Sequence, residues 1–138
     1  MSHLLDTNIL SELRKSQRRA NAGVRSWIAG RVAADLYLSV ITILEIEVGI
    51  QRIARNDTVQ AQRLQSWLDM EVLDAFAGRI LSVDAPVVRR CARMHVPDPQ
   101  PERDALIAAT ASVHGLTVVT RSVRDFEPLG VPVINPWS

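Results

Sequence analysis

The chain has 138 residues, of which 47% are hydrophobic and 22% are charged, a balance that excludes a disordered chain, a collagen and a coiled coil. Sixteen basic and 15 acidic residues give a net charge of +1, which by itself indicates no partner. No apolar run approaches the ~20 residues of a membrane span, and the N-terminus has no basic and apolar leader. We therefore expect a cytoplasmic protein with no membrane partner.

Cys91 is the only cysteine, so we expect neither an internal disulfide nor a cysteine-based zinc site, and a reducing cytosol is the expected compartment. We expect its side chain to pack in the core. The three histidines, His3, His95 and His114, are too scattered along the sequence to predict a metal site from them.

Strands and helices are predicted to alternate along the chain. Short apolar segments predict strands, and apolar residues at helical spacing after a capping residue predict helices. In the first half we expect a strand at His3–Leu5, helices at Thr7–Lys15 and Ala22–Arg31, a strand at Leu36–Val40, a helix from a Thr42 cap to Arg55, and a long helix from an Asp57 or Thr58 cap through Ala77, ended by Gly78. In the second half we expect a strand at Ile80–Val83, a helix from Pro86 through His95, a loop at Val96–Pro101, a helix at 103–114 ended by Gly115, and strands at Leu116–Thr120 and Val131–Ile134. This alternation predicts an α/β fold with a parallel sheet covered by helices on both faces.

Four acidic residues fall where such a fold places its ligands, beyond the carboxyl ends of the strands. Asp6 follows the first strand directly, and Glu45 is expected on the first turn of the helix after the second strand. Asp125 comes a few residues after the strand at Leu116–Thr120. Asp104 has no strand directly before it and joins the set only because it opens a helix, whose N-terminus we expect to lower the pKa of Asp104.

Each acid also has an ordinary structural explanation when it is taken alone. Asp6 is in the position of a helix cap, Glu45 is within reach of Arg52 on the same helix, and Asp125 fits a turn. The recurrence of all four at equivalent positions favours a shared site instead. Because carboxylates in one crevice repel one another, they stay ionised only beside a cation, and hard oxygen ligands suit Mg²⁺ or Mn²⁺. A metal held in this way activates a water for attack on a phosphodiester.

Four segments carry a resemblance to a known family: LLDTNILSEL, SVITILEIEVGI, DALIAATASVHGLTVVTR and RDF…NPW. In order and spacing they resemble the PIN-domain ribonucleases, and more closely the VapC-type toxins of type II toxin–antitoxin modules, the FitB-like branch in particular. The resemblance runs from Leu4 to Trp137. It implies a single PIN domain over residues 1–138, with a three-layer α/β/α fold around a central parallel sheet.

The resemblance also implies an activity, a cofactor and a set of site residues. The family members are Mg²⁺- or Mn²⁺-dependent endoribonucleases, and their metal-holding and catalytic acids correspond to Asp6, Glu45, Asp104 and Asp125. Supporting roles fall to Asn8, Thr120 and Ser122. The family commonly has Asn where this chain has Ser122, which makes a direct role for that side chain doubtful.

The expected partners are an RNA substrate and a small cognate antitoxin whose C-terminal segment covers the acidic groove, in a homodimer or a larger heteromeric assembly. Fifteen of the 16 basic residues are Arg, which suits phosphate binding but also follows from a GC-rich genome. Arg121 and Arg124, close to Asp125, are the expected RNA contacts, with Arg14 as a weaker candidate. The alternative function is a catalytically weak module that binds an antitoxin and so contributes to a repressor complex.

Overall fold

A five-stranded, fully parallel sheet in the order β3-β2-β1-β4-β5 forms the centre of the computed structural model, which describes residues 1–138. The strands are β1 (His3–Leu5), β2 (Leu36–Ser39), β3 (Ile80–Leu81), β4 (Thr117–Val119) and β5 (Val133–Ile134). The helices are α1 (Thr7–Leu13), α2 (Ala22–Ala29), α3 (Val40–Ala54), α4 (Thr58–Trp67), α5 (Leu73–Ala75), α6 (Ala85–Met94), α7 (Glu102–His114) and α8 (Val123–Phe126). Two 3₁₀ turns, η1 (Ala33–Asp35) and η3 (Glu127–Leu129), and one π-helical turn, η2 (Leu68–Val72), complete the chain.

The sheet separates two apolar cores. Because successive strand side chains point to opposite faces, Leu4 and Val118 enter the core under α6, α7 and α8, whereas Leu5 and Val119 enter the core under α1 to α4. All four side chains are fully buried, and each such burial contributes roughly 1.5–3 kcal/mol. The predicted three-layer α/β/α arrangement is therefore confirmed.

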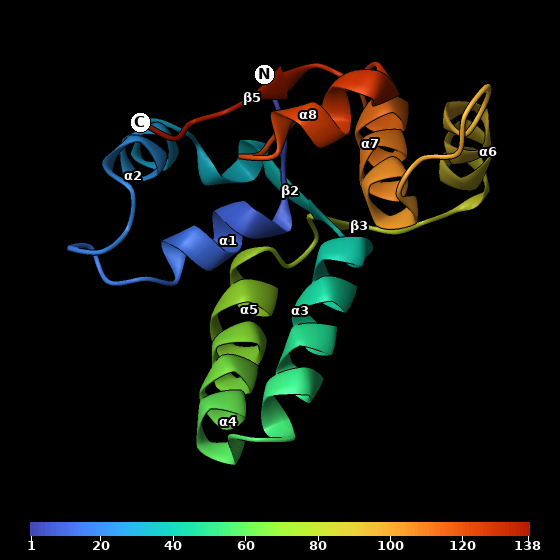
Figure 1. Ribbon diagram of the computed structural model, residues 1–138. Helices are drawn as coiled ribbons and strands as arrows, with labels where there is room; N and C mark the ends of the chain where they lie inside the picture. Colours follow the sequence, from blue (N-terminus) through green and yellow to red (C-terminus); the bar gives the residue numbers. More distant parts are fainter.

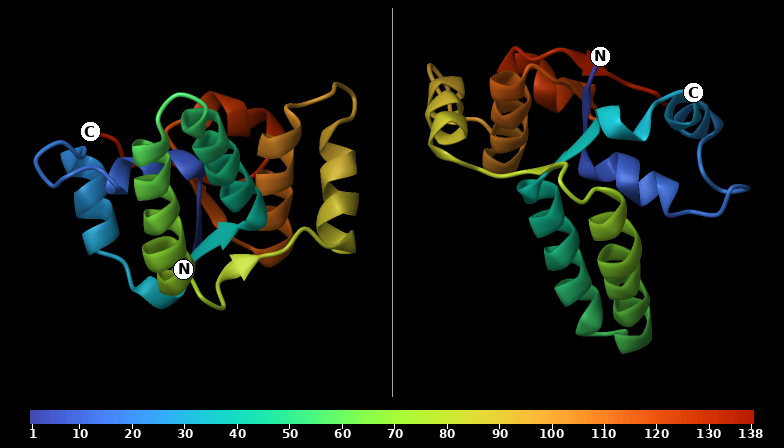
Figure 2. Two further views of the ribbon diagram at one scale, coloured as in Figure 1. Left: turned by 90° about the horizontal axis from the view of Figure 1, so that it is seen from below. Right: turned by 180° about the vertical axis from the view of Figure 1, so that it is seen from behind.

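Helix α7 lies close to the sheet because its inner face is built from small side chains. Ala105, Ala108, Ala109 and Ala111 are fully buried. The helix ends at Gly115, as expected, and this residue has the left-handed conformation (φ 67°) that glycine adopts without strain. Helix α6 packs on α7 and forms the outer edge of the molecule (Figure 2).

Helices α3 and α4 form an antiparallel pair that projects away from the sheet (Figure 1). The predicted Thr42 cap is wrong: the Ser39 hydroxyl accepts from the Ile41 backbone N–H (3.0 Å), and the helix begins at Val40. Ser39 takes the role because β2 runs directly into the helix and leaves no intervening residue. Glu45 consequently lies on the second turn of α3 instead of the first.

The long helix expected through Ala77 is interrupted. Asp57 caps α4 as predicted, its side chain accepting from Gln60 N–H (2.9 Å). A π-helical turn then inserts at Leu68–Val72, and the helix ends at Ala75, so Gly78 (φ 80°) follows the end instead of capping it. Met70, within this turn, is 75% exposed. A 3.6-residue period in the sequence does not reveal such an insertion.

No helix is of a length and apolarity that would let it cross a membrane. The C-terminus lies beside α2 (Figures 1 and 2), where the Asn21 side chain accepts from the backbone N–H groups of Val24 (3.2 Å) and Ser138 (3.1 Å). This contact holds the C-terminal residue at the start of α2.

Candidate active site

The candidate site lies beside β1, where the order in which the chain adds strands to the sheet reverses. From β1 the chain continues to β2 and β3 on one side, and β4 and β5 lie on the other. Asp6 follows β1 and Thr120 follows β4, and the Asp6 backbone N–H donates to Val119 O (2.9 Å). Ligands of open α/β sheets bind beyond the carboxyl ends of the strands at the point where the strand order reverses.

Asp6 is the most deeply buried of the four acids and both of its oxygens have a donor. Oδ1 accepts from the Thr7 backbone N–H (2.8 Å) and Oδ2 from the Thr120 hydroxyl (2.7 Å). The structure therefore makes Asp6 the cap of α1 and a member of the acidic cluster at once. Burial raises the pKa of Asp6, the two hydrogen bonds oppose this, and the charges of Glu45 and Asp125 add to the rise.

Glu45 is held by a residue that the sequence analysis does not single out. The Thr7 hydroxyl donates to Glu45 Oε1 (2.7 Å), and it lies 3.2 Å from the hydroxyl of the buried Thr42. Glu45 forms no ion pair with Arg52, so that alternative is wrong. The signal that could have identified Thr7 is its position between two candidate residues, Asp6 and Asn8.

The expected effect of the helix N-terminus on Asp104 is wrong. The side chain is half-buried on the first turn of α7, and its pKa is raised from 3.8 to about 6. Burial is the largest cause, followed by the charges of Asp6, Asp125 and Glu45. Desolvation and the repulsion of three carboxylates outweigh the partial positive charge of a helix end.

Asp125 completes the cluster from the exposed side. It lies on α8, a short helix that the sequence analysis does not predict, and its backbone N–H donates to Ser122 O (3.0 Å). Its charge contributes to the raised pKa of both Asp6 and Asp104. The structure thus brings Asp6, Glu45 and Asp125 into electrostatic range of Asp104.

The three supporting residues form a hydrogen-bonded link between α1 and the segment after β4. Asn8 Nδ2 donates to Thr120 Oγ1 (3.2 Å) and to Ser122 Oγ (3.3 Å). Asn8 Oδ1 accepts from the Arg121 backbone N–H (3.3 Å), and Ser122 N–H donates to Thr120 Oγ1 (2.9 Å). The Ser122 hydroxyl therefore has a role in holding Asn8, which holds Thr120 beside Asp6.

Arginine side chains lie around this cluster. Arg121 and Arg124 are exposed and form no ion pair, and the Arg121 guanidinium lies 5.4 Å from the centre of the Trp137 ring. Arg14 lines a hollow of about 280 Å³ between α1, α3 and α4, together with Thr7 and Glu45.

The donor set fits a hard divalent cation. None of the four acids forms an ion pair with Lys, Arg or His, although neighbouring carboxylates raise the pKa of Asp6 and of Asp104. Carboxylate oxygens are the ligands that Mg²⁺ and Mn²⁺ prefer. Asp6, Glu45, Asp104 and Asp125 are thus the residues that would hold such an ion.

Comparison with known proteins decides the family. The family model for the PIN domain matches residues 3–127. The chain belongs to the PIN-domain family. Toxin FitB of Neisseria gonorrhoeae is 37% identical over 97% of both chains, and VapC ribonuclease Y4jK of Sinorhizobium fredii is 36% identical over 97% of this chain and 96% of its own.

Solved PIN-domain structures share the architecture. The crystal structure of FitAcB from Neisseria gonorrhoeae matches with a TM-score of 0.86 at 36% identity and covers 97% of each chain. A structure of FitAB bound to an IR36 DNA fragment has the same TM-score at 34% identity, and covers 98% of this chain and 95% of its own. The sequence resemblance to PIN-domain toxins is confirmed.

Proposed function

We propose that this PIN-domain chain is an endoribonuclease that requires a divalent metal and acts as the toxin of a toxin–antitoxin pair. The observation that carries the proposal is the group of four carboxylates, without a cationic partner, at the switch point of the sheet. Relatives over nearly the whole chain are named a toxin and a ribonuclease, which supports the same function.

In this proposal Asp6, Glu45, Asp104 and Asp125 hold Mg²⁺ or Mn²⁺. When bound, the cation supplies a water of lowered pKa and stabilises the charge that develops on a phosphodiester. The chain's own residues fix the ligands. Thr7 and Thr120 donate to the two oxygens of Asp6 and Thr7 also to Glu45, so neither carboxylate rotates freely.

RNA is the proposed substrate and the exposed arginines are its proposed contacts. Arg121 and Arg124 are free of carboxylate partners, so their guanidinium groups are available to phosphate oxygens. Their position after β4 puts them in the same segment as Ser122 and Asp125.

A cognate antitoxin is the proposed protein partner. A solved structure that matches this chain at 28% identity, with a TM-score of 0.71, is a toxin–antitoxin complex from Klebsiella pneumoniae. We propose a corresponding heteromeric assembly, with a toxin homodimer or a larger oligomer, in the cytoplasm. The second candidate is a catalytically weak antitoxin-binding module, which predicts the same assembly without RNA cleavage. This function does not explain why four carboxylates without a cationic partner gather at one site.

Cleavage of a structured RNA by the purified chain in Mg²⁺ tests the proposal. We expect wild-type chain to cleave and Asp6→Asn and Asp104→Asn to lose cleavage while keeping the fold. Asp74→Asn is the matched control, because Asp74 is exposed on α5 and outside the cluster. Full cleavage by both site variants would exclude the proposed site, and a folded wild-type chain that never cleaves would favour the binding module.

A further inference from the structure

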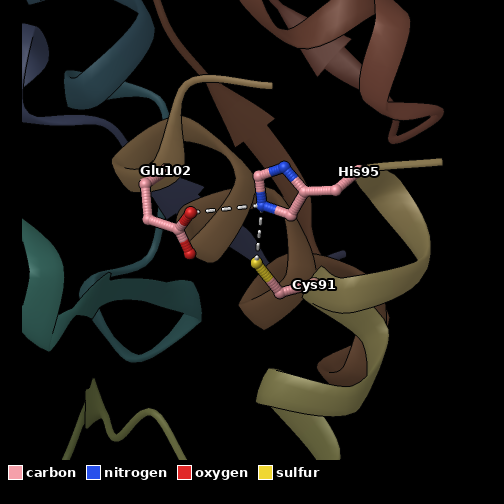
Figure 3. Close-up of side chains that lie close together, drawn as sticks. All are labelled: Cys91, His95 and Glu102. Atoms are coloured by element: carbon pink, nitrogen blue, oxygen red, sulfur yellow. Dashed lines mark hydrogen bonds and ion pairs between the residues drawn. The ribbon is translucent and has the colours of Figure 1, made fainter. Parts of the chain in front are cut away.

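A second group of metal-ligating side chains lies outside the carboxylate cluster, where the C-terminal end of α6 meets the first residue of α7 (Figure 3). Cys91 Sγ, His95 Nε2 and a Glu102 carboxylate oxygen lie within 4.8 Å of one another. Cys91 and His95 are four residues apart and so share one side of the helix end. Sequence spacing does not join them to Glu102, because the loop at 96–101 separates the two parts.

Two spacings in this group are close to those between neighbouring ligands of one metal ion. Nε2 of His95 lies 3.4 Å from Glu102 Oε2 and 3.7 Å from Cys91 Sγ. An N–H···O bond has its usual range at about 2.7–3.2 Å. Tetrahedral zinc, with bonds of about 2.3 Å to sulfur and about 2.0–2.1 Å to nitrogen or oxygen, places neighbouring ligand atoms about 3.3–3.6 Å apart.

We propose that Cys91, His95 and Glu102 form a binding site for a zinc-class divalent cation, with the fourth position open to water. Sulfur and imidazole nitrogen select borderline-soft ions, whereas the four carboxylates of the other site select hard ions. Cys91 is buried, but the Glu102 side chain is 72% exposed, which provides an entry path from solvent. The inference does not depend on the proposed nuclease function.

Binding at Nε2 rearranges protons in a defined way. The Gln100 backbone N–H donates to His95 Nδ1 (3.0 Å), so without metal the ring proton is on Nε2. A cation at Nε2 shifts the ring proton to Nδ1 and turns the Gln100 amide away, at the cost of one hydrogen bond. The Cys91 thiol loses its proton to solvent, and no electron is transferred. Because the thiol must lose its proton before the sulfur binds a cation, metal affinity should increase with pH.

The bound cation would tie α6 to α7 across the loop at 96–101. Cys91 is in the core that α6 and α7 share, and Glu102 is the first residue of α7. The tether would therefore fix the start of the helix that carries Asp104, two residues beyond Glu102.

Titration of the chelator-treated chain with Co²⁺ tests the site, because a thiolate ligand gives Co²⁺ a near-ultraviolet charge-transfer band that carboxylates do not give. We expect the band at one Co²⁺ per chain, its removal by Zn²⁺, and its retention in Asp6→Asn. Cys91→Ala should abolish the band, and Glu102→Gln and His95→Gln should weaken Co²⁺ binding by at least about tenfold.

Controls keep the test decisive. Glu102 is exposed, so Glu102→Gln leaves the fold intact even where a change of the buried Cys91 does not. Glu127→Gln and His114→Gln remove an exposed carboxylate and an exposed imidazole outside the cluster and should leave the band unchanged. Absence of the band in wild-type chain, or a band that persists at full affinity in Glu102→Gln and His95→Gln, would overturn the proposal.

Discussion

At the residue scale, the acidic cluster contains electrostatic repulsion that should be visible as a dependence of stability on pH. Between about pH 4 and pH 6 the folded, metal-free chain binds more protons at Asp104 than the unfolded chain does, because its pKa is raised from 3.8 to about 6. The free energy of unfolding therefore falls as pH rises through this window, and the loss is complete above it. Raised pKa at Asp6 acts in the same direction.

Asp104→Asn should remove this penalty. At pH 7 without metal we expect the variant to be more stable by about 1 kcal/mol, a value reduced for the partial exposure of the side chain. Below about pH 4 the two proteins should be equally stable. Denaturant unfolding at several pH values measures the difference, with Asp74→Asn as the control. A stability difference that does not change with pH would contradict the electrostatic origin.

We expect the Thr7 hydroxyl to contribute to metal binding and cleavage by orienting Glu45, and not by packing. Thr7→Val keeps the shape and the backbone N–H that binds Asp6, but removes the 2.7 Å hydrogen bond to Glu45. We expect metal affinity and cleavage to fall about 10- to 100-fold. Thr7→Ser should restore both. Equal loss in the Ser and Val variants would show that the methyl group, and not the hydroxyl, is the part that matters.

At the scale of elements, alanine substitutions at Gly115 and Gly49 distinguish the effect of backbone conformation on stability from the effect of side-chain packing. An added Cβ would meet nothing within 4 Å at Gly115 or at Gly49, but only Gly115 has a left-handed conformation (φ 67°). Gly115→Ala should therefore destabilise the chain by about 1 kcal/mol. Gly49→Ala, inside α3, should stabilise it by up to about 1 kcal/mol. Thermal unfolding checks both, and effects of the same sign would contradict this account of how α7 ends.

The predicted and observed helices and strands agree in position more often than in their exact ends. Each strand and every helix of seven or more residues overlaps a segment that the apolar pattern predicts, because that signal is local, but the pattern does not reveal the π-helical turn at Leu68–Val72. The start of α3 is not predictable to the residue, because a buried Ser39 and a buried Thr42 are equally good caps in sequence. Helix α8 escapes prediction because it has one turn only, with a single fully buried side chain, Phe126.

The sequence predicts which acidic residues form the candidate site, but it does not predict how their pKa values shift. Asp6, Glu45 and Asp125 follow from the rule that ligands bind beyond the carboxyl ends of strands. The sign of the Asp104 pKa shift depends on how near the other three carboxylates come, which the sequence does not encode locally. The same holds for the Thr7 contact with Glu45, which joins residues 38 positions apart.

At the scale of the whole molecule, the arginines near the site should set the salt dependence of RNA binding. Replacing Arg121 and Arg124 together by Gln should weaken binding and lower the slope of log affinity against log salt by about 0.7 for each RNA phosphate that the variant no longer neutralises. Arg55→Gln with Arg63→Gln, an equal reduction of charge at exposed positions on the α3–α4 pair, is the control. A slope that stays unchanged in the first pair would place the RNA-binding surface elsewhere.

Metal should also stabilise the fold as a whole. An ion that binds only the folded state adds about 2.7 kcal/mol at a hundred times its Kd. Millimolar Mn²⁺ should raise the melting temperature of wild-type chain more than that of Asp6→Asn. Equal shifts in the two proteins would mean that the stabilising ion binds outside the carboxylate cluster.

The dependence of RNA cleavage on Mn²⁺ tests most directly the central claim that the four carboxylates form a metal-dependent nuclease site. Wild-type chain should not cleave in EDTA, should recover full cleavage when Mn²⁺ exceeds the chelator, and should reach half of its maximal rate at the Mn²⁺ concentration that half-saturates binding. Asp104→Asn should stay inactive at every Mn²⁺ concentration that the wild type needs. Cleavage by the wild type that is as fast in EDTA as in Mn²⁺ would contradict the account.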